Sequence, residues 1–78
     1  MTPSEFRDWR MKLGLKQKDA AELLGLKKRV IQYYEKGSRD ERPVEIPRSV
    51  ELACFALTQG VGRFDGTRAD PVRLSDET

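Results

Sequence analysis

The sequence predicts an all-α fold, a compact domain of four or five helices that contains a helix-turn-helix. Three observations predict it. Apolar residues recur at the three- and four-residue spacing of amphipathic helices. Glycines stand where each of the first three helical segments would end. Only the three residues from Gly25 to Lys27 separate the second segment from the third, and a short turn of this kind that contains glycine is the helix-turn-helix signature.

The first helix is expected to begin at Thr2-Pro3-Ser4-Glu5, where Thr2 and Glu5 can form a capping box around Pro3. Phe6, Trp9 and Leu13 then share one face, which indicates that they lie in the core, and Gly14 would end the helix. The second helix is predicted over residues 17–24 and the third from residue 28 to residue 35 or 36. Their inward residues would be the following: Ala20, Ala21, Leu24, Ile31 and Tyr34.

The start of the third helix holds three consecutive cations, Lys27, Lys28 and Arg29. A helix N-terminus carries partial positive charge, so each exposed cation there is unfavourable by roughly 0.3–1 kcal/mol. The usual N-cap residues are also missing, since Lys16 and Lys27 precede the second and third helices. This arrangement indicates that the compensating negative charge comes from outside the chain.

After the third helix, the charged segment 38–46 is interpreted as a loop, and a fourth helix is expected from Pro47 to Thr58 or Gln59. Its buried face would consist of Val50, Ala53, Cys54 and Leu57. Beyond Gly60 the chain contains two more glycines and one proline, and its apolar residues lack helical periodicity. We therefore expect a flexible tail. The predicted organisation is therefore a helix-turn-helix domain over residues 1–59 and a tail over residues 60–78, part of which could dock at a dimer interface.

Composition narrows the possible functions. The chain has 78 residues, 37% of them apolar and 36% charged, which suits one small soluble domain that would gain stability from self-association. It lacks an apolar run of membrane-spanning length and a signal-peptide pattern, so we expect a cytoplasmic protein without membrane contact. With one cysteine and no histidine, the sequence offers neither a metal site nor a nucleophile–base pair. We therefore expect no enzyme activity, no cofactor and no small-molecule ligand.

The positive charge is concentrated in the predicted helix-turn-helix. Residues 16–39 hold seven cations and three anions, a net charge of +4. Residues 65–78 hold two cations and four anions, a net charge of −2. A basic segment of this kind indicates an acidic partner, and an ordinary solvated surface is the alternative.

The residues from Gln17 to Gly37 follow the pattern Q-x-x-A-A-x-x-L-G-L-x-x-x-x-I-x-x-Y-E-x-G. This pattern resembles the Cro/C1-type helix-turn-helix family, the lambda repressor-like DNA-binding domains, and the resemblance extends in outline over residues 4–58. More narrowly, AAELLGLKKRVIQYY is similar to small autorepressors encoded beside anti-CRISPR genes on phages and mobile elements. The family commonly has Ser or Thr at the positions of Lys16 and Lys27, and its minimal pattern has a shorter loop than residues 38–46.

The resemblance implies that the third helix enters the major groove of double-stranded DNA. The residues implied to contact base edges are Lys28, Arg29 and Gln32. Those implied to contact phosphate are Gln17, Lys18, Lys27, Tyr33, Lys36 and Arg39. A solvated first turn is the alternative for Lys28 and Arg29, and packing against the first helix is the alternative for Tyr33. The long loop either brings arginines to phosphate or only extends into solvent; contact is favoured for Arg39 and left open for Arg42.

The function predicted from these observations is a sequence-specific transcriptional regulator, a homodimeric repressor or autorepressor that binds an inverted-repeat operator. Activation stays open. Dimer contacts are expected from Leu52, Phe55 and Phe64. The alternative is a protein-binding adaptor, an antitoxin or antiactivator that uses the same fold to bind an acidic protein surface.

Overall fold

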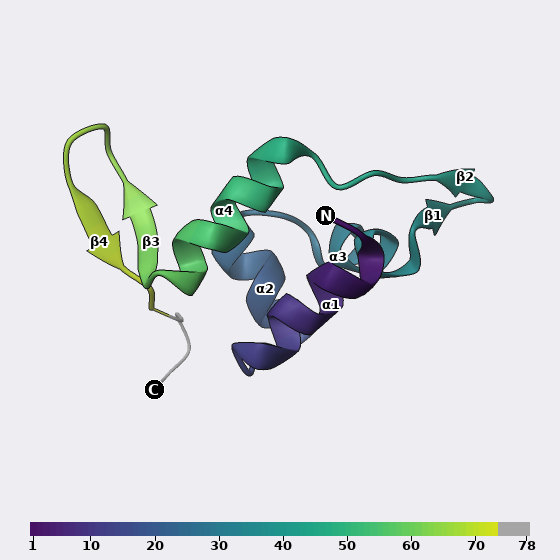
Figure 1. Ribbon diagram of the computed structural model, residues 1–78, viewed down its shortest axis with the longest axis horizontal. Helices are drawn as coiled ribbons and strands as arrows, with labels where there is room; N and C mark the ends of the chain where they lie inside the picture. The colour runs from purple at the N-terminus through teal and green to yellow at the C-terminus, as the bar shows by residue number, and fades with distance from the viewer. Residues whose placement is uncertain (74–78) are drawn as a thin grey trace.

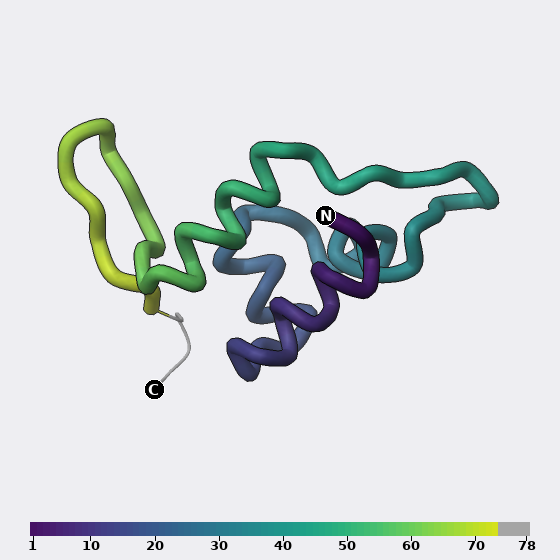
Figure 2. The backbone as a smooth tube through the Cα atoms, in the orientation of Figure 1, coloured from purple at the N-terminus to yellow at the C-terminus, as the bar shows by residue number. Residues whose placement is uncertain are grey.

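The computed structural model describes residues 1–73, which form four helices and two antiparallel two-stranded hairpins (Figure 1). The helices are α1 (Pro3–Lys12), α2 (Gln17–Leu24), α3 (Lys28–Lys36) and α4 (Arg48–Thr58). The strands are β1 (Ser38–Arg39), β2 (Arg42–Pro43), β3 (Val61–Phe64) and β4 (Ala69–Pro71). The hairpins lie at opposite ends of the molecule, whose longest dimension is 40 Å (Figure 2).

The helix-turn-helix forms as the sequence predicts. α2 and α3 have the expected bounds, and Gly25 ends α2 in the left-handed conformation at φ 71°. Ala20 and Ala21 are buried, so small side chains occupy the inward face of α2. Phe6, Ile31 and Cys54, from three different helices, are the largest fully buried side chains. A single core therefore joins the helix-turn-helix to α1 and α4.

The beginning of α1 follows the prediction, whereas Leu13, which was expected in the core, is 39% exposed because it lies past the last helical residue as the C-cap. Thr2 Oγ1 accepts a hydrogen bond from the Glu5 N–H, and a Glu5 carboxylate oxygen accepts one from the Thr2 N–H, which completes the capping box. Trp9 is half-buried, and its indole N–H lies within hydrogen-bonding distance of Cys54 O at 3.1 Å and Thr58 Oγ1 at 2.9 Å. Trp9 therefore links α1 to α4 through its indole N–H.

An ion-pair network connects α1, α2 and α3. The Arg10 guanidinium donates to both carboxylate oxygens of Glu35, with N–O distances of 2.5 and 3.0 Å, and to the Leu15 carbonyl at 2.9 Å. Gln17 Nε2 donates to the same carboxylate at 3.3 Å. The Arg10 and Glu35 side chains are only 13% and 10% exposed. The network therefore fixes α3 against both preceding helices.

α4 begins one residue later than expected, because Pro47 is its N-cap and Arg48 its first helical residue. The predicted inward face is buried at Val50, Cys54 and Leu57 and half-buried at Ala53. Burial raises the pKa of the Cys54 thiol to about 11. The thiol is therefore protonated at neutral pH and packs as a small apolar side chain.

The expectation of an all-α fold was wrong in two segments. The predicted loop contains the β1–β2 hairpin, and the predicted tail contains the β3–β4 hairpin between Val61 and Pro71. Asp65 closes the second hairpin, since its Oδ1 accepts hydrogen bonds from the N–H groups of Thr67 and Arg68. These bonds lower the pKa of Asp65. The expectation of a flexible tail extends to residues 74–78, which lie outside the described part of the chain.

The buried ion pair gives a stability prediction. Replacing Glu35 with Ala leaves the Arg10 guanidinium in a mostly buried position without its counter-charge, so we expect the free energy of unfolding to fall by about 3 kcal/mol. Urea denaturation followed by circular dichroism measures the change. Arg68→Ala serves as the control, because it breaks an ion pair with Asp70 whose side chains are 79% and 56% exposed. Equal effects of the two substitutions would contradict the structural role of Glu35.

Candidate nucleic-acid interface

One side of α3 presents only polar side chains to solvent. Successive residues of an α-helix are rotated by about 100° around its axis. That rotation places four exposed residues within one arc of about 100°: Lys28, Gln32, Lys36 and Arg29. Ile31 and Tyr34 lie on the opposite side and are buried. We call these four exposed residues the polar face of α3.

The beginning of α3 lacks a compensating negative group. Its N-cap, Lys27, makes no side-chain capping hydrogen bond, and the first turn contains no acidic residue. The beginning of α2 is different, because an Asp19 carboxylate oxygen accepts a hydrogen bond from the Lys16 N–H at 3.0 Å. Lys27, Lys28 and Arg29 are all exposed, so an anion can approach both these cations and the free N–H groups of the first turn.

The two residues predicted at the start of α2 occupy different environments. Lys18 is exposed, whereas Gln17 is half-buried and its side chain is bonded to Glu35. The Gln17 side chain is therefore directed toward the ion-pair network. What Gln17 can offer a phosphate is its backbone N–H, because the first N–H groups of a helix lack partners within the helix.

Tyr33 and Arg39 form a pair at the edge of the polar face. Tyr33 is half-buried and lies about 40° beyond Arg29 around the helix axis. The Cζ atom of Arg39, on β1, lies 5.2 Å from the centroid of the Tyr33 ring, which is a cation–π contact. The structure thus brings Arg39 beside α3, although it belongs to the next element.

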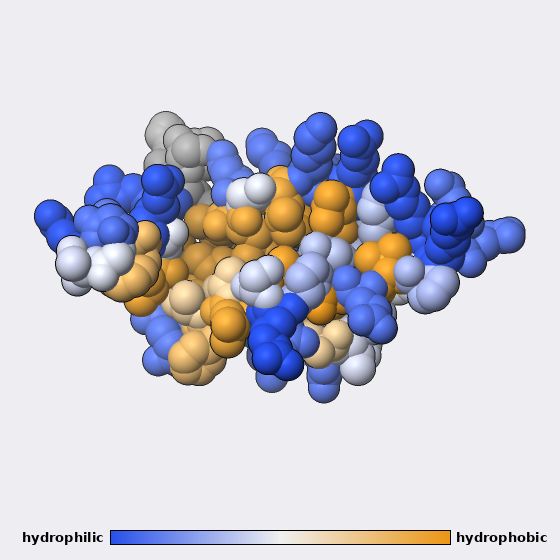
Figure 3. Space-filling view, turned by 90° about the horizontal axis from the view of Figure 1, so that it is seen from above, coloured by the Kyte–Doolittle hydropathy of each residue, from blue (hydrophilic) through white to orange (hydrophobic). Residues whose placement is uncertain are grey.

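The three residues predicted at a dimer interface lie on other elements. Leu52 and Phe55 on α4 are each 64% exposed, and Phe64 on β3 is 68% exposed. Figure 3 views the molecule from above. On the face that it shows, apolar residues gather along the middle and hydrophilic residues lie over the right-hand end. Leu52, Phe55 and Phe64 therefore lie on elements other than α2 and α3.

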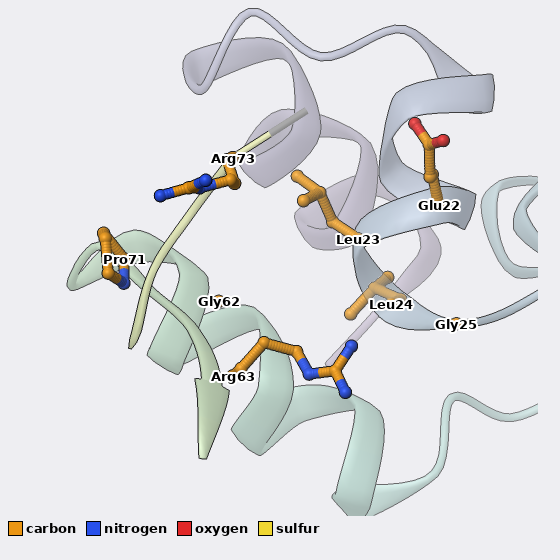
Figure 4. A pocket seen from close by; sticks show the side chains of 8 residues that line it. All are labelled: Glu22, Leu23, Leu24, Gly25, Gly62, Arg63, Pro71 and Arg73. Atoms are coloured by element: carbon orange, nitrogen blue, oxygen red, sulfur yellow. The ribbon is translucent and has the colours of Figure 1, made fainter. Parts of the chain in front are cut away.

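A hollow of about 380 Å³ lies between the end of α2 and the β3–β4 hairpin. Its lining includes Leu24, Gly25, Arg63 and Arg73. Arg63 extends from β3 toward the end of α2 (Figure 4). No group of three or more potential metal ligands occurs among residues 1–73, and no helix in that range is long and apolar enough to cross a membrane.

Sequence reasoning missed two features near the polar face. It assigned Gln17 to a phosphate contact, because nothing in the sequence indicated that the Gln17 side chain would reach Glu35. It also left Arg42 undecided, because a loop without regular structure does not fix where a side chain lies. The pairing of Arg42 with Arg39 across β1 and β2 becomes evident only from the hairpin register.

Comparison with known proteins agrees with this geometry. A family model described as Helix-turn-helix, HTH_3, matches residues 6–53, which is more than half of the chain and includes all of α2 and α3. No curated protein and no solved structure matches the chain. HTH_3 is a family of DNA-binding regulators and not a family of enzymes. The chain belongs to the Cro/C1-type helix-turn-helix family.

Proposed function

We propose that the protein is a sequence-specific transcriptional regulator that binds double-stranded DNA as a homodimer. The observation that carries the proposal is the polar face of α3, which is exposed while the opposite side of the same helix is buried. An α-helix with this division fits the major groove, where each base pair presents a distinct pattern of donors and acceptors.

The roles of the residues follow from their chemistry and position. Lys28, Arg29 and Gln32 would contact base edges, Arg29 through two donors to guanine and Gln32 through its amide to adenine. The phosphate contacts would come from the surrounding residues, Lys18, Lys27, Tyr33, Lys36 and Arg39, together with the backbone N–H of Gln17. Contacts to phosphate position the protein, whereas contacts to bases give specificity.

The exposed apolar residues of α4 and β3 support a homodimer. Leu52 and Phe55 are three residues apart on α4 and are therefore neighbours on the helix surface, and an isologous interface would place them and Phe64 of two copies in contact. Because these residues lie outside α2 and α3, such an interface leaves the polar face of α3 free. Two-fold symmetry then presents two α3 helices to the half-sites of an inverted repeat, about 34–36 Å apart or a multiple of this distance.

Repression is the simplest mode of regulation for such a protein. A dimer bound across a promoter excludes polymerase by steric overlap, and this needs no further domain or ligand. If the operator lies upstream of the protein's own gene, the protein limits its own synthesis according to its concentration.

A gel-shift titration tests the proposal. The probe is duplex DNA from upstream of the protein's own gene, and the competitor is random duplex of equal length. We expect retention of the probe at competitor concentrations that remove non-specific binding. Binding to neither duplex would contradict the proposal and favour an acidic protein surface as the partner.

Two substitutions should separate base contacts from phosphate contacts. Arg29→Ala should weaken binding to the cognate site by about 1–3 kcal/mol and relax specificity at one base position. Lys36→Ala should weaken cognate and random DNA alike and reduce the salt slope by about one unit. Fluorescence anisotropy over a salt series measures both effects. Equal losses on cognate and random DNA for Arg29→Ala would contradict its assignment to a base.

The dimer gives a separate prediction. Phe55→Ala removes an aromatic side chain that is 64% exposed in the single chain, so it should shift the monomer–dimer equilibrium toward monomer with little loss of fold stability. Sedimentation equilibrium measures the dissociation constant. Met11→Ala is the matched control, because Met11 is 59% exposed but belongs to α1. A monomeric wild-type protein at micromolar concentration would contradict the dimer.

A further inference from the structure

The β1–β2 hairpin holds two arginines directly opposite each other. Arg39 and Arg42 are partners in its antiparallel register, and residues directly opposite share one face of a strand pair. Both are exposed, and together with Asp40 and Val44 they line one hollow. Like charges in this relation destabilise a strand pair. The free protein therefore gains no stability from having arginine at both positions.

A tight turn fixes this pairing. The two residues between the arginines, Asp40 and Glu41, have φ values of 50° and 66°, in the left-handed region. Turns of this kind usually contain Asn-Gly, Asp-Gly or Gly-Gly, so Asp40 suits its position and Glu41 stands where glycine is preferred. The base of the hairpin is closed by a hydrogen bond from the Val44 N–H to the Gly37 carbonyl at 3.1 Å. The turn therefore holds the two arginines in register, although Glu41 is a residue that rarely adopts a positive φ.

The hairpin is attached directly to the polar face of α3. Only Gly37 separates α3 from β1, and the Arg39 guanidinium lies over the Tyr33 ring at the edge of that face. The hairpin then projects beyond the helical body (Figure 2). The arginine pair therefore lies beyond the end of α3 from which the chain continues, and Arg39 reaches back to the edge of the polar face.

The hairpin contains two arginines, and its turn contains two carboxylates. The net charge of these four residues is zero, so net charge alone does not identify a ligand. The Arg39–Asp40 ion pair is 3.9 Å long and both side chains are more than 60% exposed, which makes it weak. Among residues 1–73, Arg42 makes no ion pair, and Glu41 does not line the hollow. The face that carries both arginines is thus available to an external anion.

We infer that Arg39 and Arg42 together clamp one phosphate of the DNA backbone beside the groove that α3 enters. Guanidinium groups bind phosphate oxygens through paired N–H donors, and an anion between two of them converts their repulsion into attraction. This inference rests on the proposed function. It adds Arg42 to the interface and makes the β1–β2 hairpin a second DNA-contacting element.

The first test is Arg42→Ala, with binding measured by anisotropy on cognate and random duplex over a salt series. We expect a loss of about fivefold to tenfold on both duplexes at 0.1 M salt and a salt slope lower by about one unit, as for one lost phosphate contact. The matched control is Arg68→Ala, which removes the same charge from the β3–β4 hairpin and should bind as the wild type does. Equal losses for the two variants would overturn the clamp.

Two further variants separate binding from hairpin stability. Arg42→Glu places an opposite charge across from Arg39, so it should raise the thermal midpoint while weakening DNA binding more than Arg42→Ala does. Asp40→Asn removes the carboxylate from the hollow and keeps a residue that tolerates positive φ, so it should strengthen binding severalfold. A lower thermal midpoint for Arg42→Glu, or weaker binding by Asp40→Asn, would overturn the clamp.

The two proposals fail in different ways. If the wild-type protein binds neither duplex, the proposed function is wrong, and the clamp fails with it. If the wild type binds and Arg29→Ala relaxes specificity, but Arg42→Ala binds as the wild type does, only the clamp is wrong.

Discussion

The arrangement of the helix-turn-helix depends on one ion pair that is largely shielded from solvent. Arg10 donates hydrogen bonds to both carboxylate oxygens of Glu35 and to the carbonyl of Leu15. Gln17 donates a hydrogen bond to the Glu35 carboxylate as well. These contacts tie together α1, the segment that leads into α2, the first residue of α2, and the side of α3 next to its polar face. A helix that enters a DNA groove must be held at a fixed angle to the protein elements that contact the DNA backbone. Here polar contacts hold that angle, whereas the apolar core around Phe6 and Ile31 supplies the burial.

The helical part of the fold was predictable because local signals coincide with tertiary packing. The capping box at Thr2 and the stops at Gly14, Gly25 and Gly37 are local, and the apolar spacing selected the helical residues that the structure buries, with Leu13 as an exposed exception. Glu35 lies beside Tyr34 on α3, and its carboxylate is bonded within the ion-pair network. Its partners, Arg10 and Gln17, were not identified, because sequence spacing does not tell which side chains from other helices will reach it.

The hairpins were not predicted, for two different physical reasons. Asp65-Gly66 between the short runs at 61–64 and 69–72 is a recognised turn signal, but Gly62 and Pro71 obscured the strands. Gly62 lies where a side chain would meet Val72, so it is required by the close approach of the strands. The Asp40-Glu41 turn carries no such signal, since glutamate rarely adopts a positive φ. The polar face of α3 could be predicted from helical periodicity. A role for Arg42 could be inferred only from the strand register of the β1–β2 hairpin.

If the protein binds an operator as proposed, the uncapped, cation-bearing start of α3 has a consequence for the lifetime of the protein in a cell. A ligand that binds only the folded state stabilises it by mass action, and a negatively charged ligand at this position would also remove a local repulsion. Copies held on an operator would then unfold less often than unbound copies. Since proteolysis acts on unfolded chains, surplus molecules would be degraded first. A weak helix start would in this way match the number of surviving molecules to the number of sites they occupy.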